Sequence, residues 1–225
     1  MIQINKKILL GSGSPRRKLL LTELGINFRV LKSNTPEIPP GELIRGDIAR
    51  FLSEEKAIAL KNEFHADEIL LTADTIVWLD SSMLGKPADA KEAYLMLKLL
   101  SGRKHQVYTA FSLLEKDSMK TICVESNVQF CKLEENEIAE YIENYQPFDK
   151  AGAYGAQECF QEGINPCSEK EINFMKVYSC ENLFDKTISA ENKKRIQLID
   201  YIDGSFFNVM GLPVVELVEE LNKLK

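Results

Sequence analysis

EILLTADTIVWLD, residues 68–80, is the most strand-like stretch of the sequence, and the expected fold is built outward from it. Its density of Ile, Leu, Val and Trp is typical of a buried β-strand. Asp74 interrupts the apolar run, and an unpaired carboxylate buried in a strand costs several kcal/mol. We therefore expect Asp74 to be neutralised, paired with a cation or bound to a metal. The alternative is a carboxylate at a strand end that faces water.

The segments on either side alternate between strand and helix patterns. We expect strands at residues 6–10, 26–31, 105–114 and 121–133, with residues 83–87 as a short return after a turn at Ser81-Ser82. We expect helices at residues 15–24, 43–64, 90–100 and 134–145, and a last helix from Pro213. The segment 158–203 is less regular: residues 172–177 have strand character and residues 191–202 look helical. This mixture favours an α/β or α+β class.

Length and composition describe an ordinary globular chain. Its 225 residues, 44% hydrophobic and 28% charged, suffice for one sizeable core or two small lobes that share a cleft. No apolar run approaches the roughly 18 residues of a membrane span, and no secretory signal is visible at the N-terminus. The net charge of −6 argues against a general nucleic-acid or anionic-membrane binder. Any anion site must therefore be local.

The cysteines predict reduced thiols. There are five of them, an odd number, and none forms a C-x-x-C pair, so we expect a cytoplasmic protein without a disulfide framework. His65 and His105 lie far apart in sequence, which argues against a metal site built from His and Cys.

Residues 9–25, LLGSGSPRRKLLLTELG, join a strand to a helix through a turn of glycines and serines. Ser14 suits the N-cap, Pro15 suits the first helical position and Gly25 ends the helix. Neither a Walker loop nor the third glycine of G-x-G-x-x-G is present. Capping alone therefore accounts for part of the stretch.

Capping does not account for Arg16 and Arg17 in the first turn. Cations there oppose the helix dipole, and a bound anion would relieve that opposition. The hydroxyl of Ser12 and the two planar guanidinium groups suit phosphate oxygens. The stretch is thus either a capped helix start or an anion-binding loop.

Four further polar residues are individually unremarkable. Lys86 follows Asp74 by way of one turn, Glu37 lies in the Pro-rich loop, Lys56 lies in the next helix, and Gln157 ends the loop AGAYGAQ. Together they supply carboxylates for a hard divalent cation, cations for several phosphates and small residues for close approach. This is the inventory for attack on a polyphosphate.

Four motifs occur in an order that resembles the Maf (septum-formation inhibitor) family of nucleoside triphosphate pyrophosphatases. They are GSGSPRRKLLLTELG, ADTIVWLDSSMLGKPADAKEAYLMLKLLSGRKHQVYTA, DKAGAYGAQE and GSFFNVMGLPVVEL. The resemblance implies an α/β fold of the Maf/ITPase-like type, with a twisted mixed sheet flanked by helices and two lobes around a central cleft. We accordingly expect a single Maf-like domain over residues 1–225. The segment 158–203 departs from the family pattern and is expected to be an insertion or an extended segment.

The implied activity is hydrolysis of a nucleoside triphosphate between the α and β phosphates, which yields the monophosphate and pyrophosphate and needs a divalent cation, Mg²⁺ or Mn²⁺. Asp74 matches the family's proton acceptor, although the residues leave open whether it is a base, a metal ligand or both. The other residues with implied catalytic, metal-binding or phosphate-binding roles are Glu37, Lys86, Ser12, Arg17 and Lys56, with Glu37 also a candidate metal ligand. Positions linked to base preference are Arg16, Thr75 and Gln157, and they look like the subfamily that prefers dTTP and UTP.

Two other functions stay open at this point. One is a nucleotide-responsive regulator of cell division that acts through a protein partner. The other is a phosphomonoesterase, which would release orthophosphate. The expected partners are a nucleoside triphosphate and a second copy of the chain in a homodimer, with no nucleic acid and no membrane.

Overall fold

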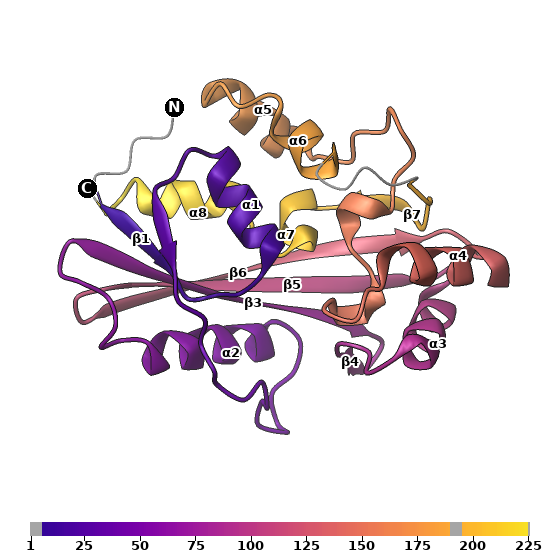
Figure 1. Ribbon diagram of the computed structural model, residues 1–225, viewed down its shortest axis with the longest axis horizontal. Coiled ribbons are helices and arrows are strands. Elements are labelled where there is room, and N and C mark those ends of the chain that lie inside the picture. Colours follow the sequence, from indigo (N-terminus) through magenta and orange to yellow (C-terminus); the bar gives the residue numbers. More distant parts are fainter. Residues whose placement is uncertain (1–5, 190–194, 225) are drawn as a thin grey trace.

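A single mixed β-sheet organises the molecule. The computed structural model describes residues 6–189 and 195–224, and in these residues the sheet has seven strands. Its order is β2-β1-β3-β5-β6-β7, with β4 paired to β3 (Figure 1). The strands are β1 (Lys7–Leu10), β2 (Phe28–Val30), β3 (Glu68–Leu79), β4 (Ser82–Leu84), β5 (Lys104–Glu115), β6 (Ser118–Phe130) and β7 (Ile199–Asp203). The expected mixed sheet is confirmed.

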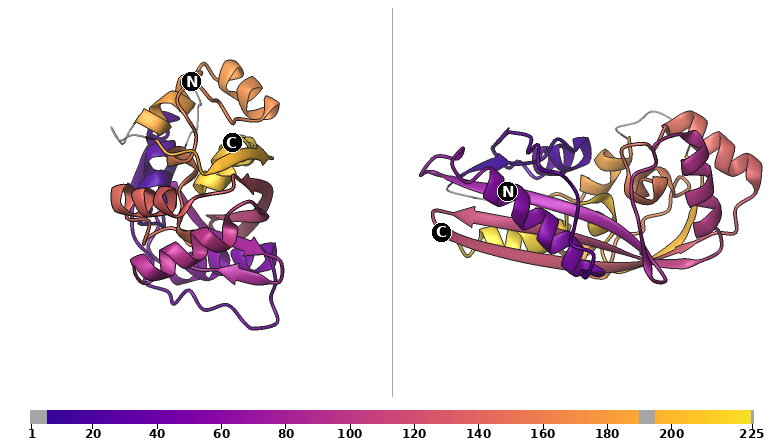
Figure 2. Two further views of the ribbon diagram at one scale, coloured as in Figure 1. Left: turned by 90° about the vertical axis from the view of Figure 1, so that its right-hand side faces the viewer. Right: turned by 90° about the horizontal axis from the view of Figure 1, so that it is seen from below.

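Strand β3 joins the parallel and the antiparallel parts of this sheet. On one side it pairs in parallel with β1, from Glu68 to Leu71, and β1 pairs in parallel with β2. On the other side it pairs with β5 in antiparallel register, and β5 forms the predicted hairpin with β6. The hairpin runs most of the length of the molecule (Figure 2). The strand predicted at residues 68–80 is therefore the centre of the sheet.

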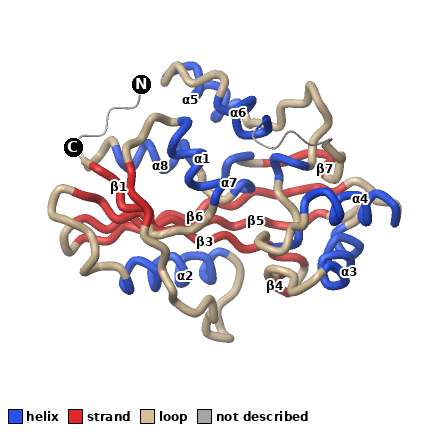
Figure 3. Tube along the Cα trace, in the orientation of Figure 1, coloured by secondary structure: helices blue, strands red, loops and turns tan. Residues whose placement is uncertain are grey.

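Helices cover both faces of the sheet (Figure 3). Helix α2 (Gly46–Ala59) lies on one face, where Ile48 and Leu52 pack against Ile76 and Trp78 of β3. Helices α1 (Pro15–Glu23), α7 (Phe206–Met210) and α8 (Val214–Leu221) lie on the opposite face, over the larger part of the core. Since successive side chains of a strand point to opposite faces, β3 contributes to both cores.

The remaining helices lie outside these two layers. Helices α3 (Ala90–Leu100) and α4 (Glu135–Tyr145) pack together at one end of the molecule (Figure 1). Helices α5 (Glu169–Val177) and α6 (Leu183–Ser189) lie beyond α1 and α8. Among the described residues, no helix combines the length and hydropathy needed to cross a bilayer. All five cysteines are free thiols.

Two sequence predictions within the segment 158–203 are wrong. The strand expected at residues 172–177 is part of α5, because Ser168 and Glu171 form a reciprocal capping box that starts a helix. The helix expected at residues 191–202 is replaced at its end by β7, which pairs with β6 and so completes the sheet. Residues 191–194 lie outside the described part of the chain. Edge pairing, a tertiary interaction, overrides local helix propensity here.

Glu171 links this segment to the core. It is almost fully buried, and its carboxylate accepts hydrogen bonds from the Ser205 hydroxyl (2.7 Å) and from the backbone N–H groups of Phe206 (3.1 Å) and Phe207 (2.9 Å). These groups start α7, so the carboxylate both caps that helix and complements its dipole. The contacts support the proposal that the chain is a single domain that includes residues 158–203.

His105 is a buried histidine whose charge state couples stability to pH. Its Nε2 lies 2.7 Å from the Tyr154 hydroxyl, and its ring packs edge-on against Phe130. Burial lowers the pKa of His105 from 6.5 to about 3. The folded chain thus keeps the ring neutral, whereas the unfolded chain binds a proton below pH 6.5, so this contribution to stability is lost as the pH falls from 6.5 towards 3.

We predict that replacing His105 with glutamine, which hydrogen-bonds but does not titrate, flattens the pH dependence of folding. Between pH 7 and pH 5 the wild-type free energy of unfolding should fall by about 2 kcal/mol more than that of His105→Gln. Urea denaturation at both pH values measures this difference. Any pH-independent loss of stability caused by the substitution cancels, because the comparison uses the change between the two pH values within each protein. Equal pH dependence in the two proteins would contradict the assignment.

Candidate active site

The candidate site lies where one edge of β3 has no neighbouring strand. On that edge β1 pairs with β3 only as far as Leu71, and β4 begins to pair at Val77. Residues 72–76 are therefore open on this side, and the chain leaves β1 through Gly11, whose N–H donates to the Leu71 carbonyl. Asp74 and Thr75 lie in this gap. Because they point to opposite faces of the sheet, one opening exposes both of them.

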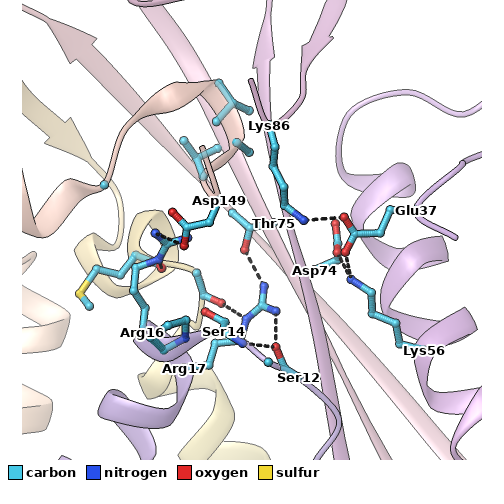
Figure 4. A pocket seen from close by; sticks show the side chains of 18 of the residues that line it. Ser12, Ser14, Arg16, Arg17, Glu37, Lys56, Asp74, Thr75, Lys86 and Asp149 are labelled. Atoms are coloured by element: carbon cyan, nitrogen blue, oxygen red, sulfur yellow. Dashed lines mark hydrogen bonds and ion pairs between the residues drawn. The ribbon is translucent and has the colours of Figure 1, made fainter. Parts of the chain in front are cut away.

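A cavity of about 360 Å³ fills the gap. Its walls come from the β1–α1 turn, the Pro-rich loop, β3, the loop after α4 and the α7–α8 turn. Eight of the nine residues predicted from the sequence line it: Ser12, Arg16, Arg17, Glu37, Lys56, Asp74, Thr75 and Lys86. Figure 4 shows these side chains, which come from distant parts of the sequence, gathered around Arg17.

Arg17 is the most highly connected side chain of the cavity. Its Nε donates to the Gly211 carbonyl (2.8 Å), its Nη1 to the Ser12 hydroxyl (3.0 Å) and the Ala73 carbonyl (2.9 Å), and its Nη2 to the Thr75 hydroxyl (3.0 Å). The Ala73 contact satisfies a carbonyl that β1 leaves unpaired.

All four partners of Arg17 are neutral, and no carboxylate of the described residues forms an ion pair with it. Burial lowers its pKa to about 10, while Asp74 acts in the opposite direction, so the guanidinium is charged at neutral pH. The cavity therefore holds a positive charge with no direct counter-ion, next to the N-terminus of α1. Both features favour a bound anion.

Hydroxyl groups continue this network under the cavity floor. Thr75 accepts from Arg17, and its hydroxyl lies 2.9 Å from that of Thr109, which donates to the Asn208 carbonyl (2.8 Å). Since the Thr109 proton is used in that bond, Thr75 must be the donor to Thr109. The direction of the Thr75 hydroxyl is thus set through Thr109 by the Asn208 carbonyl of α7.

Asp74 is paired with a cation, as its burial requires. Its Oδ1 accepts a short hydrogen bond from Lys56 Nζ, and Lys56 also donates to Glu37 Oε1 at 2.9 Å. Glu37 Oε2 in turn accepts from Lys86 Nζ at 2.6 Å. The predicted proximity of Asp74 and Lys86 thus takes the form of a chain of alternating charges, Asp74–Lys56–Glu37–Lys86 (Figure 4).

Glu37 is ionised in this chain. Partial burial would raise its pKa, but the hydrogen bonds from Lys86 and Lys56 outweigh burial and lower the pKa to about 2. Asp74 and Glu37 lie on the two sides of one ammonium group, which brings two carboxylates together. Oxygen ligands of this kind fit Mg²⁺ or Mn²⁺, and Mg²⁺ is commonly held by one or two carboxylates plus phosphate oxygens of a substrate.

The carboxylates that could contribute to a metal site here are limited to this pair. No group of three or more His, Cys, Asp or Glu side chains suited to a metal is found within residues 6–189 and 195–224. A metal here would therefore need the substrate to complete its ligands.

Two predicted residues behave differently from the simplest expectation. Ser14 stands at the N-cap of α1, but its side chain makes no capping hydrogen bond; its N–H donates instead to the Ser12 hydroxyl (3.3 Å). Gln157 does not line the cavity, because the last residue of its loop that lines the cavity is Gly155. Gln157 is buried and donates from Nε2 to Glu158 Oε1 (2.9 Å).

Asp149 lines the cavity but is not among the site residues predicted from the sequence. It follows α4 and is held by Lys150, while Arg16 lies opposite, with its Nε donating to the Met210 carbonyl (3.1 Å). Asp149 opens the motif DKAGAYGAQE, which the sequence marks only as a glycine-rich loop. The carbonyls of Met210 and Gly211 could not be found from side-chain chemistry at all, because backbone atoms carry no residue signal.

The fold and cavity define an α/β protein with a charged pocket, in which buried cations and a paired carboxylate face the same space. The sequence model of the Maf-like protein family matches residues 7–175, and the chain belongs to this family.

Named relatives align over nearly the whole chain. The dTTP/UTP pyrophosphatase of Bacteroides thetaiotaomicron is 39% identical over 219 residues, which cover 97% of this chain and 96% of that protein. The dTTP/UTP pyrophosphatases of Flavobacterium johnsoniae and Bacillus cytotoxicus are 36% and 37% identical, covering 97% of this chain and 95% of each relative. A solved dITP/XTP pyrophosphatase from Mycobacterium abscessus covers 56% of this chain and 74% of its own, with 15% identity and a TM-score of 0.34, which supports no further conclusion.

We predict that Arg17→Lys destabilises the fold, although the charge is kept. A lysine ammonium cannot reach the acceptors on Ser12, Thr75 and Gly211 together, so at least two hydrogen bonds to a charged group are lost. The free energy of unfolding should fall by about 3 kcal/mol in urea denaturation. Arg50→Lys is the matched control, because Arg50 is exposed and donates only to the Thr121 carbonyl. Equal stability of the two variants would contradict the central role of Arg17.

Proposed function

We propose that this chain is a nucleoside triphosphate pyrophosphatase that hydrolyses dTTP and UTP to the monophosphate and pyrophosphate. The observation that carries the proposal is the placement of Asp74 and Arg17 on either side of β3 in one cavity: a paired carboxylate faces the same space as a buried cation without a counter-ion. The named activity of the relatives, which align with nearly the whole chain, supports the substrate class.

The cations of the cavity bind the triphosphate. A triphosphate carries about four negative charges, which gain most from fixed cations and N–H groups as charge shifts in the transition state. Arg17 and the N-terminus of α1 provide one such group, and the Ser12 hydroxyl lies beside them. Lys86 is half exposed at the mouth, so it can exchange Glu37 for a phosphate oxygen when substrate enters.

Asp74 acts as the proton acceptor. Its contact with Lys56 offsets the cost of burying the carboxylate, and its second oxygen, Oδ2, accepts no hydrogen bond from the described residues. A water molecule at that oxygen would be oriented and deprotonated for attack on phosphorus. Lys56 and Glu37 position Asp74 and link it electrostatically to Lys86.

A divalent cation, Mg²⁺ or Mn²⁺, would be held by Asp74 and Glu37 together with oxygens of the substrate. When bound, it would neutralise part of the charge on the phosphates and on the leaving group. Base preference is assigned to Arg16 and Thr75 in the cavity and to Gln157, which acts from behind the wall through the loop 149–155. We also propose that the protein is a homodimer and that it is located in the cytoplasm. The cytoplasm is an environment in which the free thiols stay reduced.

The released ion tests the proposal. Purified protein is incubated with Mg²⁺ or Mn²⁺ and a panel of triphosphates, and the products are separated. We expect pyrophosphate with dTTP and UTP. Orthophosphate would instead indicate a phosphomonoesterase, and binding without turnover would indicate a nucleotide-responsive regulator.

We predict that Asp74→Asn separates binding from turnover. The amide keeps the shape of the side chain but cannot take up a proton, so pyrophosphate release from UTP should fall by about 10²- to 10⁴-fold. Isothermal titration should still detect UTP binding. Asp117→Asn, in the exposed turn between β5 and β6, is the control and should retain wild-type turnover. Near-normal turnover by Asp74→Asn would contradict the assignment of Asp74 as the base.

A further inference from the structure

We propose that the Asp149 carboxylate accepts a hydrogen bond from the ring N3–H of uracil or thymine, and is thereby a specificity-determining residue. The inference rests on the proposed function and names the group that reads the base.

The cavity has two chemically different ends. Asp74, Lys56, Glu37 and Lys86 lie on one side of Thr75, whereas Asp149 and Arg16 lie on the other (Figure 4). Arg17, which contacts both Thr75 and Ser12, lies between the two groups, so the triphosphate extends from Asp74 to Arg17 and the Asp149 side is left for the base. The separation matters because the reacting phosphate and the base lie at opposite ends of a nucleotide, with the sugar between them. A nucleotide whose phosphate faces Asp74 therefore directs its base towards Asp149.

The walls at the Asp149 end are apolar. Val77 lies three residues beyond Asp74 on β3, which is about 10 Å along a strand. Its cross-strand partner is Val107, and the loop after α4 rests on it, since Gly152 leaves no room for a side chain beside Val77. Tyr154 of the same loop also lines the cavity. Apolar walls with a few polar groups are the usual environment of a planar base.

Asp149 differs in its surroundings from the two carboxylates at the phosphate end, Asp74 and Glu37. Partial burial would raise the pKa of Asp149, but Lys150 and Arg16 lower it further, so the group is ionised at neutral pH. Asp74 and Glu37 share the ammonium of Lys56, whereas Asp149 shares no cation with another described carboxylate that lines the cavity and does not join those two in a group suited to a metal. With neither arrangement to offset its repulsion of phosphate oxygens, its carboxylate is better suited to an uncharged part of the ligand that donates a hydrogen bond.

The position of Asp149 leaves one oxygen for the ligand. Oδ1 accepts from Lys150 Nζ at 3.2 Å, and Lys150 is itself buried beside Glu158 Oε1 at 3.3 Å, so the side chain is anchored. Oδ2 faces Arg16 Nη1 across 4.0 Å, which exceeds a hydrogen bond. Oδ2 and the Arg16 guanidinium thus present an acceptor and donors side by side.

This pair matches the edge of uracil and thymine and mismatches cytosine. Uracil and thymine present N3–H beside a carbonyl oxygen, which fits a carboxylate beside a guanidinium. Cytosine presents a lone pair at N3 and an amino group at C4, so an acceptor meets an acceptor and a donor meets a donor. Sites built around such hydrogen bonds discriminate strongly, because a wrong ligand leaves buried polar groups unpaired.

The test compares UTP, CTP and N3-methyl-UTP as substrates of the wild-type protein, Asp149→Ala, Asp149→Asn and the control Asp117→Asn. Pyrophosphate release gives kcat/KM for each. We expect the wild-type preference for UTP over CTP to fall at least tenfold in both Asp149 variants, while the control keeps it. N3-methyl-UTP, which lacks the N3–H, should gain at least tenfold relative to UTP in Asp149→Ala.

Other outcomes overturn the inference or the proposed function separately. An equal loss of kcat/KM for all three nucleotides would overturn it, because Asp149 would then bind the sugar or only hold Arg16 in place. If the wild-type protein releases no pyrophosphate from any nucleotide, the proposed function fails. Titration calorimetry with UTP and CTP then tests the inference alone, and equal UTP-to-CTP affinity ratios in wild type and Asp149→Asn would overturn it.

Discussion

Arg17 holds together three parts of the chain that form the cavity. One guanidinium joins the β1–α1 turn, the open edge of β3 and the turn after α7, and it replaces a missing strand neighbour at the Ala73 carbonyl. Because every partner is neutral, the contacts that hold the fold together leave the charge available to a ligand. The same group therefore contributes to the fold and, in the proposed function, to anion binding.

The interruption of the sheet explains how one cavity holds opposite chemistries. In a continuous sheet, Asp74 and Thr75 would face separate cores, because neighbouring residues of a strand point to opposite faces. Where β1 ends at Leu10 and β4 has not begun, the edge is open and both faces meet the same space. The lysines from the α2 side then offset Asp74, while Arg17 stands unopposed on the α1 side. Under the proposed function, this difference in charge along the cavity would orient a nucleotide from phosphate to base.

The segment 158–203 shows where local patterns mislead. Residues 172–177, which have strand character in the sequence, belong to helix α5, and the end of the helix expected at residues 191–202 is strand β7. Pairing with β6 and the capping of α7 by Glu171 outweigh local propensity. Glu171 supports the start of α7, and α7 delivers the carbonyls that orient Arg16 and Arg17. A segment outside the cavity thus helps to position Arg16 and Arg17, for which we propose roles in substrate recognition and binding. Similarly, Gln157 belongs to the predicted site by motif but lies behind its wall, where Glu158 holds it.

The sequence alone predicts the central strand, the helix that begins at Pro15 and the β5–β6 hairpin, because an apolar run, a capping pattern and a turn between two strands are local signals. The eight cavity residues are given their roles by the resemblance to the Maf family. Of these, only Asp74, Arg16 and Arg17 also stand out locally, as a charge that is costly to bury and as cations that oppose a helix dipole. The tertiary structure is needed to show that Lys56 pairs with Asp74, that Arg17 has no counter-ion among the described residues, and that Asp149 shares the cavity with Arg16. Pairings between residues this far apart depend on strand register and on the positions of backbone carbonyls. The type of a single residue does not reveal either of these.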